Sequence, residues 1–183
     1  MSPNERIKNP ELKAEAEILP HVAALADAGL VIFQISIETQ VELSGIPNLD
    51  SETGYFYGAP CEIIKAPVEY GRILFGGIED WWGAQYKFLA SLKHARFLQL
   101  QRITGAYQGE GKSVNRNQLL DAFHLWCAEQ NKCDFFLSLD FKLAKVIERA
   151  KSKAAVPVVR PSQLLTAVRS GNWPQPGSSQ HTQ

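Results

Sequence analysis

The sequence predicts an α/β fold of three layers, in which helices cover both faces of a mostly parallel sheet. Segments with helical periodicity alternate with short apolar segments along most of the chain, which is typical of this class. The segment "LVIFQIS" at 30–36 is a continuous β-rich apolar run, as expected for a strand covered on both faces. Crossover connections would place the carboxyl ends of the strands along one edge, where open α/β sheets bind ligands.

The bulk composition indicates one soluble domain. The chain has 183 residues, of which 45% are apolar and 21% charged, with a formal net charge of zero. This length allows a sizeable core, and there is no overall charge to attract nucleic acid. After Asp140, however, the chain has seven basic residues and one acid, so this part carries +6 and the first 140 residues carry −6. The asymmetry fits an acidic site beside a basic face, although a solvated helix face explains it more simply.

Cysteine usage and hydropathy predict a cytoplasmic protein with no membrane segment. The three cysteines, Cys61, Cys127 and Cys133, form no C-x-x-C pair, which argues against a disulfide framework and a structural zinc site. No apolar run approaches the roughly 18 residues of a membrane helix. The polar start "MSPNERIKNPELKAEAE" lacks the apolar core of a signal peptide.

The first half of the chain is expected to form two helices around a strand, followed by a loop and a long helix. A helix over 11–29 would end at Gly29, with Pro20 kinking or splitting it. After the strand, Ser36 is a plausible N-cap for the next helix. The remaining expected segments are a loop at 46–60, two short strands in "CEIIKAPVEYGRILF" broken near Pro67 and Gly71, an amphipathic helix at 79–101 and a polar loop at 105–117.

The second half is expected to alternate regularly between helices and strands. The predicted segments are a helix at 117–130, a strand at 134–139, a helix at 141–153, the strand "VPVVR" at 156–160 and a helix at 161–170 with Pro161 in its first turn. Residues 1–170 would thus form one domain. The Pro-, Gly- and Ser-rich tail at 171–183 is expected to be disordered.

Two aspartates bracket a helix and a strand that are expected to run antiparallel. Asp121 would lie in the first turn of the helix, and Asp140 just past the strand. About ten helical residues span roughly 15 Å and about five strand residues roughly 17 Å, so the reversal at "QNKC" brings both aspartates to the same end. The simpler interpretations are that Asp121 favours the helix dipole and that Asp140 caps the next helix.

A third carboxylate could join the two aspartates from the helix after 30–36. Glu38 and Glu42 lie one turn apart on one face of that helix, although Glu42 is also explained as a solvated residue. Carboxylates on separate elements repel one another unless a cation lies among them, and such oxygen ligands suit Mg²⁺ or Mn²⁺. Phosphodiester hydrolysis is the natural chemistry of such a site.

Two stretches resemble the PIN-domain nucleases. They are "LLDAFHLWCAEQNKCDFFLSLDFKL" with the following "VPVVRPSQLL", and the S-x-x-T-x-x-E-L pattern of Ser36, Thr39, Glu42 and Leu43. The resemblance covers roughly 11–45 and 117–168. It implies that Asp121, Asp140 and Glu42 are the metal-binding and catalytic acids, with Ser36, Thr39 and Ser138 as supporting hydroxyl residues.

The resemblance implies a metal-dependent ribonuclease that uses Mg²⁺ or Mn²⁺ to hydrolyse RNA. Many members of this family are toxins paired with an antitoxin protein, and others act in RNA processing. The segment 46–75 would be an insertion that serves substrate or partner binding. Whether the protein forms a homodimer stays open.

One part of the family pattern is missing. PIN domains begin with a central strand that carries an Asp, usually as Asp-x-Asn, but nothing before Leu30 resembles a buried strand, and Asp27 falls near the end of a helix. We expect the true start codon to lie upstream, with low activity for this chain alone. The alternative is a catalytically inactive PIN-like interaction module.

Other motifs point more weakly to function. "GAYQGEGKS" lacks the first P-loop glycine, because position 106 is Ala106. His124, Trp126 and Cys127 invite a metal or nucleophile role, yet packing is the simpler interpretation in this apolar segment. Trp81 and Trp82 could stack on nucleic-acid bases, but packing is again simpler.

Overall fold

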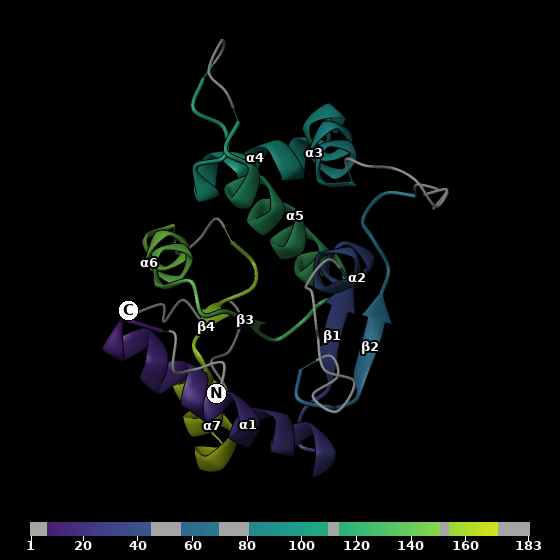
Figure 1. Cartoon of the computed structure of the whole chain (residues 1–183). Coiled ribbons are helices and arrows are strands. Elements are labelled where there is room, and N and C mark those ends of the chain that lie inside the picture. The colour runs from purple at the N-terminus through teal and green to yellow at the C-terminus, as the bar shows by residue number, and fades with distance from the viewer. Residues whose placement is uncertain (1–6, 45–55, 70–80, 110–113, 151–153, 172–183) are drawn as a thin grey trace, which may run out of the picture.

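The computed structural model describes residues 7–44, 56–69, 81–109, 114–150 and 154–171. Helices and short strands alternate along these residues, except where three helices follow one another in the middle of the chain (Figure 1). In chain order they are α1 (Pro10–Asp27), β1 (Phe33–Ser36), α2 (Ile37–Ser44), β2 (Cys61–Ile64), α3 (Trp81–Ser91), α4 (Ala95–Thr104), α5 (Arg116–Gln130), β3 (Phe136–Leu137), α6 (Phe141–Arg149), β4 (Val158–Val159) and α7 (Pro161–Ser170). The prediction of a mixed α/β protein is therefore confirmed.

Helix α1 runs unbroken through Pro20, so of the two expected effects of this proline the splitting of the helix is absent. Its first turn is closed by Asn9, whose side-chain oxygen accepts the amides of Glu11 (3.0 Å) and Leu12 (3.3 Å). The helix ends before Gly29, which takes a left-handed conformation with φ of 68°. This end lies within two residues of the one predicted from Gly29, because only glycine adopts that conformation without strain.

The four strands form two parallel pairs. β1 pairs with β2, Phe33 lying opposite Cys61, and β3 pairs with β4, Phe136 lying opposite Val158. The predicted strands at 30–36, 134–139 and 156–160 are shortened, and the expectation that 30–36 is covered on both faces is wrong for its first half. Leu30 and Ile32 are 56% and 70% exposed. Among the described residues β1 pairs only with β2, and this pairing begins at Phe33, so residues 30–32 pair with no strand.

Helices pack against these strands from two sides. The larger core gathers side chains of α3 to α6, among them Phe97, Phe123 and Trp126, and the strand residues Ile64, Phe136 and Val158 pack against it. The smaller core joins Val22 of α1 to Val159 and Leu164, with Phe33, Phe135 and Leu137 packed against it. β3 and β4 thus contribute residues to both cores.

The predicted single helix at 79–101 is wrong, because the chain breaks between α3 and α4. His94 is extended, with φ of −68° and ψ of 132°, and its Nδ1 accepts the amide of Arg96 at 3.3 Å. His94 therefore caps α4 at its start. Its ring also stacks on Trp126, with 4.6 Å between ring centroids, which holds the break against the larger core.

Several predicted features lie outside the described residues. They are the second strand expected within 70–75, most of the proposed insertion at 46–75 and the tail beyond Gly171. Of the insertion, 56–69 is described and contains β2.

A buried carboxylate joins α1 to α7. Both oxygens of Glu15 accept from Ser162, one from its amide at 2.9 Å and one from its hydroxyl at 2.7 Å. The amide of Ser162 belongs to the first turn of α7, where amides have no partner within the helix. Glu15 therefore acts as a cap supplied by another helix, and the anionic side chain also favours the helix dipole.

We expect Glu15→Ala to destabilise the fold by about 1–3 kcal/mol in urea unfolding, because it leaves the Ser162 amide without its acceptor. The matched control is Glu17→Ala, which removes an exposed carboxylate 3.9 Å from Lys13 on the same helix and should cost at most about 0.5 kcal/mol. Equal effects of the two substitutions would contradict the capping role.

Candidate functional site

Polar side chains gather at the carboxyl ends of β1 and β3. Ser36 is the last residue of β1, and Ser138 and Asp140 follow β3. Asp121 and His124 are contributed by α5, and Glu42 by α2. His124 contacts Ser36 and Glu42, and the charges of Asp140 and Glu42 act on Asp121, so these side chains lie near one another.

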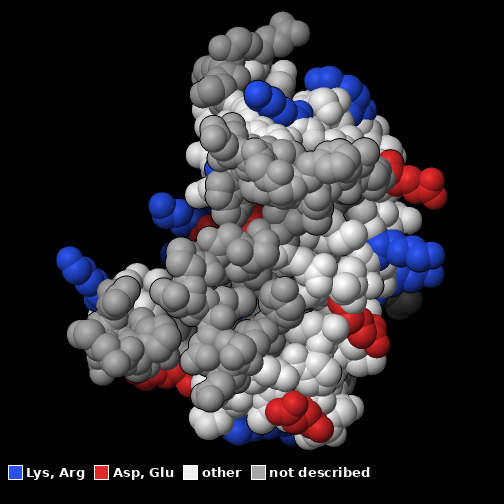
Figure 2. All heavy atoms as spheres, turned by 45° about the vertical axis from the view of Figure 1, so that its right-hand side comes forward, with Lys and Arg blue, Asp and Glu red and all other residues white. Residues whose placement is uncertain are grey.

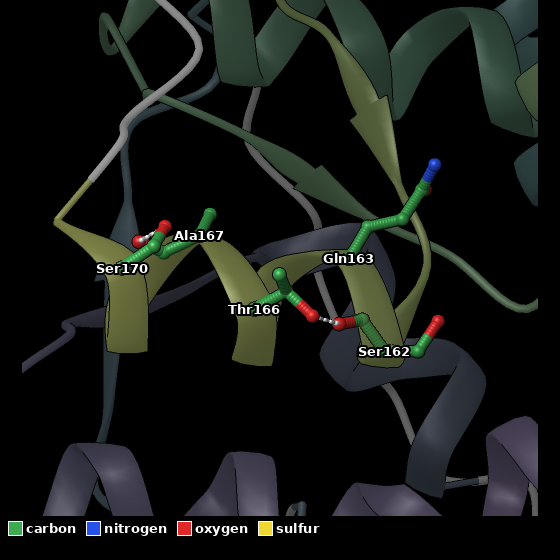
Figure 3. Close-up of a pocket in the computed structure, with 5 residues that line it drawn as sticks. All are labelled: Ser162, Gln163, Thr166, Ala167 and Ser170. Atoms are coloured by element: carbon green, nitrogen blue, oxygen red, sulfur yellow. Dashed lines mark hydrogen bonds between the residues drawn. The ribbon is translucent and has the colours of Figure 1, made fainter.

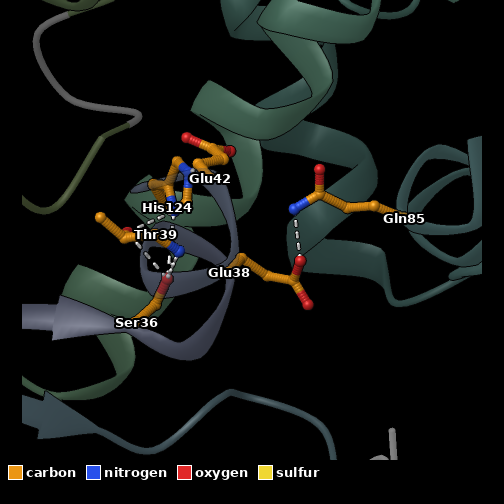
Figure 4. Close-up of polar contacts among 6 residues, drawn as sticks. All are labelled: Ser36, Glu38, Thr39, Glu42, Gln85 and His124. Atoms are coloured by element: carbon orange, nitrogen blue, oxygen red, sulfur yellow. Dashed lines mark hydrogen bonds and ion pairs between the residues drawn. The ribbon is translucent and has the colours of Figure 1, made fainter. Parts of the chain in front are cut away.

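Ser36 caps α2, as predicted. Its Oγ accepts the amide of Thr39 at 3.2 Å and lies 3.1 Å from the Thr39 hydroxyl. The same Oγ lies 3.2 Å from Nδ1 of His124, and the Thr39 hydroxyl lies 3.4 Å from that nitrogen (Figure 4). The two hydroxyl residues thus connect the start of α2 with α5.

The two glutamates of α2 have different surroundings. Glu42 Oε1 lies 3.3 Å from His124 Nε2, and its side chain is 31% exposed. Glu38 is fully buried on another side of the helix, where Gln85 Nε2 donates to it at 2.5 Å (Figure 4). Glu42, and not Glu38, is therefore the glutamate that contacts His124, so it is more than a solvated helix residue.

Asp121 lies in the second turn of α5, not in the first as predicted, because Asn115 caps the helix and Arg116 begins it. The helix dipole therefore does not account for this acid. None of the described residues donates a hydrogen bond to its carboxylate. The pKa of Asp121 is raised from 3.8 to about 6, chiefly by burial and then by the charge of Asp140. Glu42 contributes to this rise, and His124 partly opposes it.

Asp140 caps α6, as its simpler interpretation predicted. Its Oδ1 accepts the amides of Lys142 at 2.7 Å and Leu143 at 3.1 Å. Ser138 supports this turn, since its Oγ accepts the Asp140 amide at 3.0 Å. The capping uses one carboxylate oxygen, and within the described part of the chain Oδ2 has no hydrogen-bond partner.

Asp140 and Glu42 lie close enough to Asp121 for their charges to act on it, but the three acids do not form a closed ligand set. Asp140 and Glu42 both raise the pKa of Asp121. Across the described ranges, no three His, Cys, Asp or Glu side chains converge closely enough to hold a metal ion. Carboxylates alone nevertheless suit Mg²⁺ or Mn²⁺ chemically.

His124 is the residue whose place the sequence analysis misjudged. A packing role was favoured, yet both ring nitrogens meet polar atoms and the ring also makes an edge contact with Phe123. The sequence did hold a signal that His124 lies near the candidate site. His124 follows Asp121 by three positions, and residues three apart share a helix face. Packing is the correct interpretation for Trp126, which is buried against Phe97.

Two nucleophile interpretations fail on burial. Ser36, His124 and Glu42 are connected as in a Ser-His-acid triad, but Ser36 is only 4% exposed and caps α2. Cys127 is buried, and desolvation raises the pKa of its thiol to about 12, so almost no thiolate forms at neutral pH. The arrangement therefore favours the carboxylates as its reactive groups.

A groove on α7 offers no alternative site. It is lined by Ser162, Gln163, Thr166, Ala167 and Ser170 (Figure 3). The hydroxyls of Thr166 and Ser170 donate to carbonyls of their own helix, and that of Ser162 donates to Glu15. These donors are already used within the protein.

Among the described residues visible in Figure 2, acidic and basic side chains are interspersed around the rim and form no single basic patch. No helix in the described part of the chain is long and apolar enough to cross a membrane.

Comparison with protein-family models, curated proteins and solved structures found no significant match to this chain.

We expect Asp121→Asn to stabilise the protein by about 1–2 kcal/mol at pH 8 and to have little effect at pH 4. An acid whose pKa is raised on folding, here from 3.8 to about 6, is penalised in the native state when ionised. That penalty is absent below the unfolded pKa and complete above pH 6. Urea unfolding at the two pH values measures it, and an equal effect at both would contradict it.

Proposed function

We propose that this chain is a PIN-like, metal-dependent endoribonuclease whose Asp121, Asp140 and Glu42 hold Mg²⁺ or Mn²⁺. The observation that carries the proposal is the environment of Asp121. It is a largely buried carboxylate without a hydrogen-bond donor among the described residues, and two further acids raise its pKa. Strongly perturbed acids of this kind are enriched at functional sites.

The arrangement of the strands supports a PIN-like, three-layer fold in which the described residues supply no strand between the two pairs. β1–β2 and β3–β4 are separate parallel pairs, and β3 and β4 pack against both helical cores. Cys133, just before β3, donates its thiol to the Gln34 side chain of β1 at 3.1 Å, so the two pairs lie near each other. An additional strand between β1 and β3 would join them into one sheet, where the resemblance expects the central strand.

The chain's own residues prepare the site in different ways. Asp140 is held by its capping bonds and Glu42 by His124, so each keeps one oxygen without a protein partner in the described chain. When bound, the metal would supply an activated water and neutralise phosphate charge. Lys142 and Lys145 are exposed on α6 directly after Asp140 and would meet the RNA backbone.

A second candidate is a catalytically inactive PIN-like interaction module. The absence of a closed three-ligand set among the described residues favours it, as does the capping role of Asp140. For either candidate, an antitoxin-like protein is a proposed partner, and a homodimer is a proposed assembly. The enzyme requires metal and RNA, whereas the module requires neither.

We expect Mn²⁺ to bind the protein in a calorimetric titration at pH 8, and Asp121→Asn and Asp140→Asn each to weaken binding at least about tenfold, since each removes one ligand charge. Asp140→Asn is informative because Asn also caps helices well, so α6 should persist. Metal-dependent cleavage of single-stranded RNA should fall in parallel.

The matched control is Glu148→Gln, which removes an exposed acid of α6 away from its capping turn. It should bind Mn²⁺ like the wild type. If the wild type does not bind Mn²⁺, the proposed enzyme is contradicted and the inactive interaction module is favoured. If the wild type binds Mn²⁺ but neither aspartate substitution weakens binding, the metal site lies elsewhere in the protein.

A further inference from the structure

We infer that His124 is a positioning residue that holds Glu42 in the orientation needed to bind a divalent cation. This inference rests on the proposed function and assigns a role to a residue outside the three acids. His124 contacts three side chains of the β1–α2 segment: Ser36, Thr39 and Glu42. It is the described side chain that connects Glu42 with α5, the helix that carries Asp121.

The donors and acceptors fix the direction of the hydrogen bonds. A carboxylate only accepts, so Nε2 of His124 must donate to Glu42. In the neutral ring Nδ1 is then an acceptor, and a hydroxyl of Ser36 or Thr39 donates to it. Ser36 Oγ in turn accepts the Thr39 amide, which anchors the chain of bonds to the backbone of α2.

The imidazole has little room to move. Its side chain is 13% exposed, and Phe123 packs against it with 6.4 Å between ring centroids. On another side of α2, the buried pair of Glu38 and Gln85 joins the helix to α3. Helix α2 is therefore held by polar contacts from two helices, and the position of Glu42 relative to Asp121 is correspondingly restricted.

This geometry leaves one oxygen of Glu42 for a ligand. His124 engages Oε1, and no described residue bonds Oε2. Hydrogen bonds to the outer oxygen of a ligating carboxylate fix its orientation, and their loss typically lowers metal affinity 10- to 100-fold. His124 would act in this way on Glu42 without touching metal or RNA.

Two conservative substitutions separate positioning from simple packing. The amide of Gln reaches the place of Nε2 and can still donate to Glu42, whereas the shorter Asn reaches the place of Nδ1 and preserves only the contact with the hydroxyls. We expect His124→Gln to bind Mn²⁺ within about threefold of the wild type and His124→Asn to bind about 10- to 100-fold more weakly. The control is His21→Gln, which changes an exposed histidine on α1.

The metal-free protein provides a second readout. In an imidazole ¹⁵N spectrum at pH 8, His124 should be the Nε2–H tautomer, and Glu42→Ala should weaken this preference. Equal Mn²⁺ affinity of the Gln and Asn variants, or a spectrum unchanged by Glu42→Ala, would overturn the inference. If the wild type binds no Mn²⁺, the proposed metal function fails, and the spectrum alone then decides whether His124 orients Glu42.

Discussion

The packing of α5 against α4 is the constraint on which the candidate site depends. Phe97 of α4 stacks on Trp126 with 5.4 Å between ring centroids and meets Phe123 edge-on at 5.9 Å. All three are buried, so this contact fixes the rotation of α5 about its axis. Asp121 and His124 extend from other positions on the same helix, and their direction follows from what the aromatic residues bury.

A second fixed contact comes from the start of α2. Ser36 ends β1 and caps α2, so the strand determines where that helix begins, and Glu42 follows at a set distance. His124 bonds to both the cap and Glu42. The two elements that carry Glu42 and Asp121 are consequently joined by a side chain whose own helix is held by the core.

The sequence predicted local features well and the extent of the sheet poorly. The caps at Ser36 and Asp140 were recognised, because a small polar side chain before an apolar periodic segment has a local physical role. Strand length was overestimated because pairing depends on a neighbouring strand, and Leu30 and Ile32 have none in the described structure. The break at His94 was missed because the apolar stripe continues through it, without a Gly or Pro to mark it.

In the candidate site, too, the sequence predicted local features better than contacts between distant residues. Element order predicted that Asp121 and Asp140 share one edge, and the family resemblance selected Glu42 as the third acid. Both Asp140 and Glu42 raise the pKa of Asp121. The role of His124 depends on distances between residues 82 and 88 positions apart, which no local pattern encodes. Its apolar neighbours Phe123 and Leu125 made packing the natural interpretation.

The three acids differ in how the protein stabilises their charge, and this difference indicates where a cation would act most strongly. Backbone amides stabilise the charge of Asp140, and His124 contacts Glu42. Asp121 receives no hydrogen bond from the described residues, and burial raises its pKa to about 6. A cation beside Asp121 would therefore replace a missing interaction, lower this pKa and release its remaining proton. Burial without a hydrogen-bond donor makes the ionised carboxylate of Asp121 unfavourable in the metal-free protein. The same surroundings would make the binding of a cation beside it favourable.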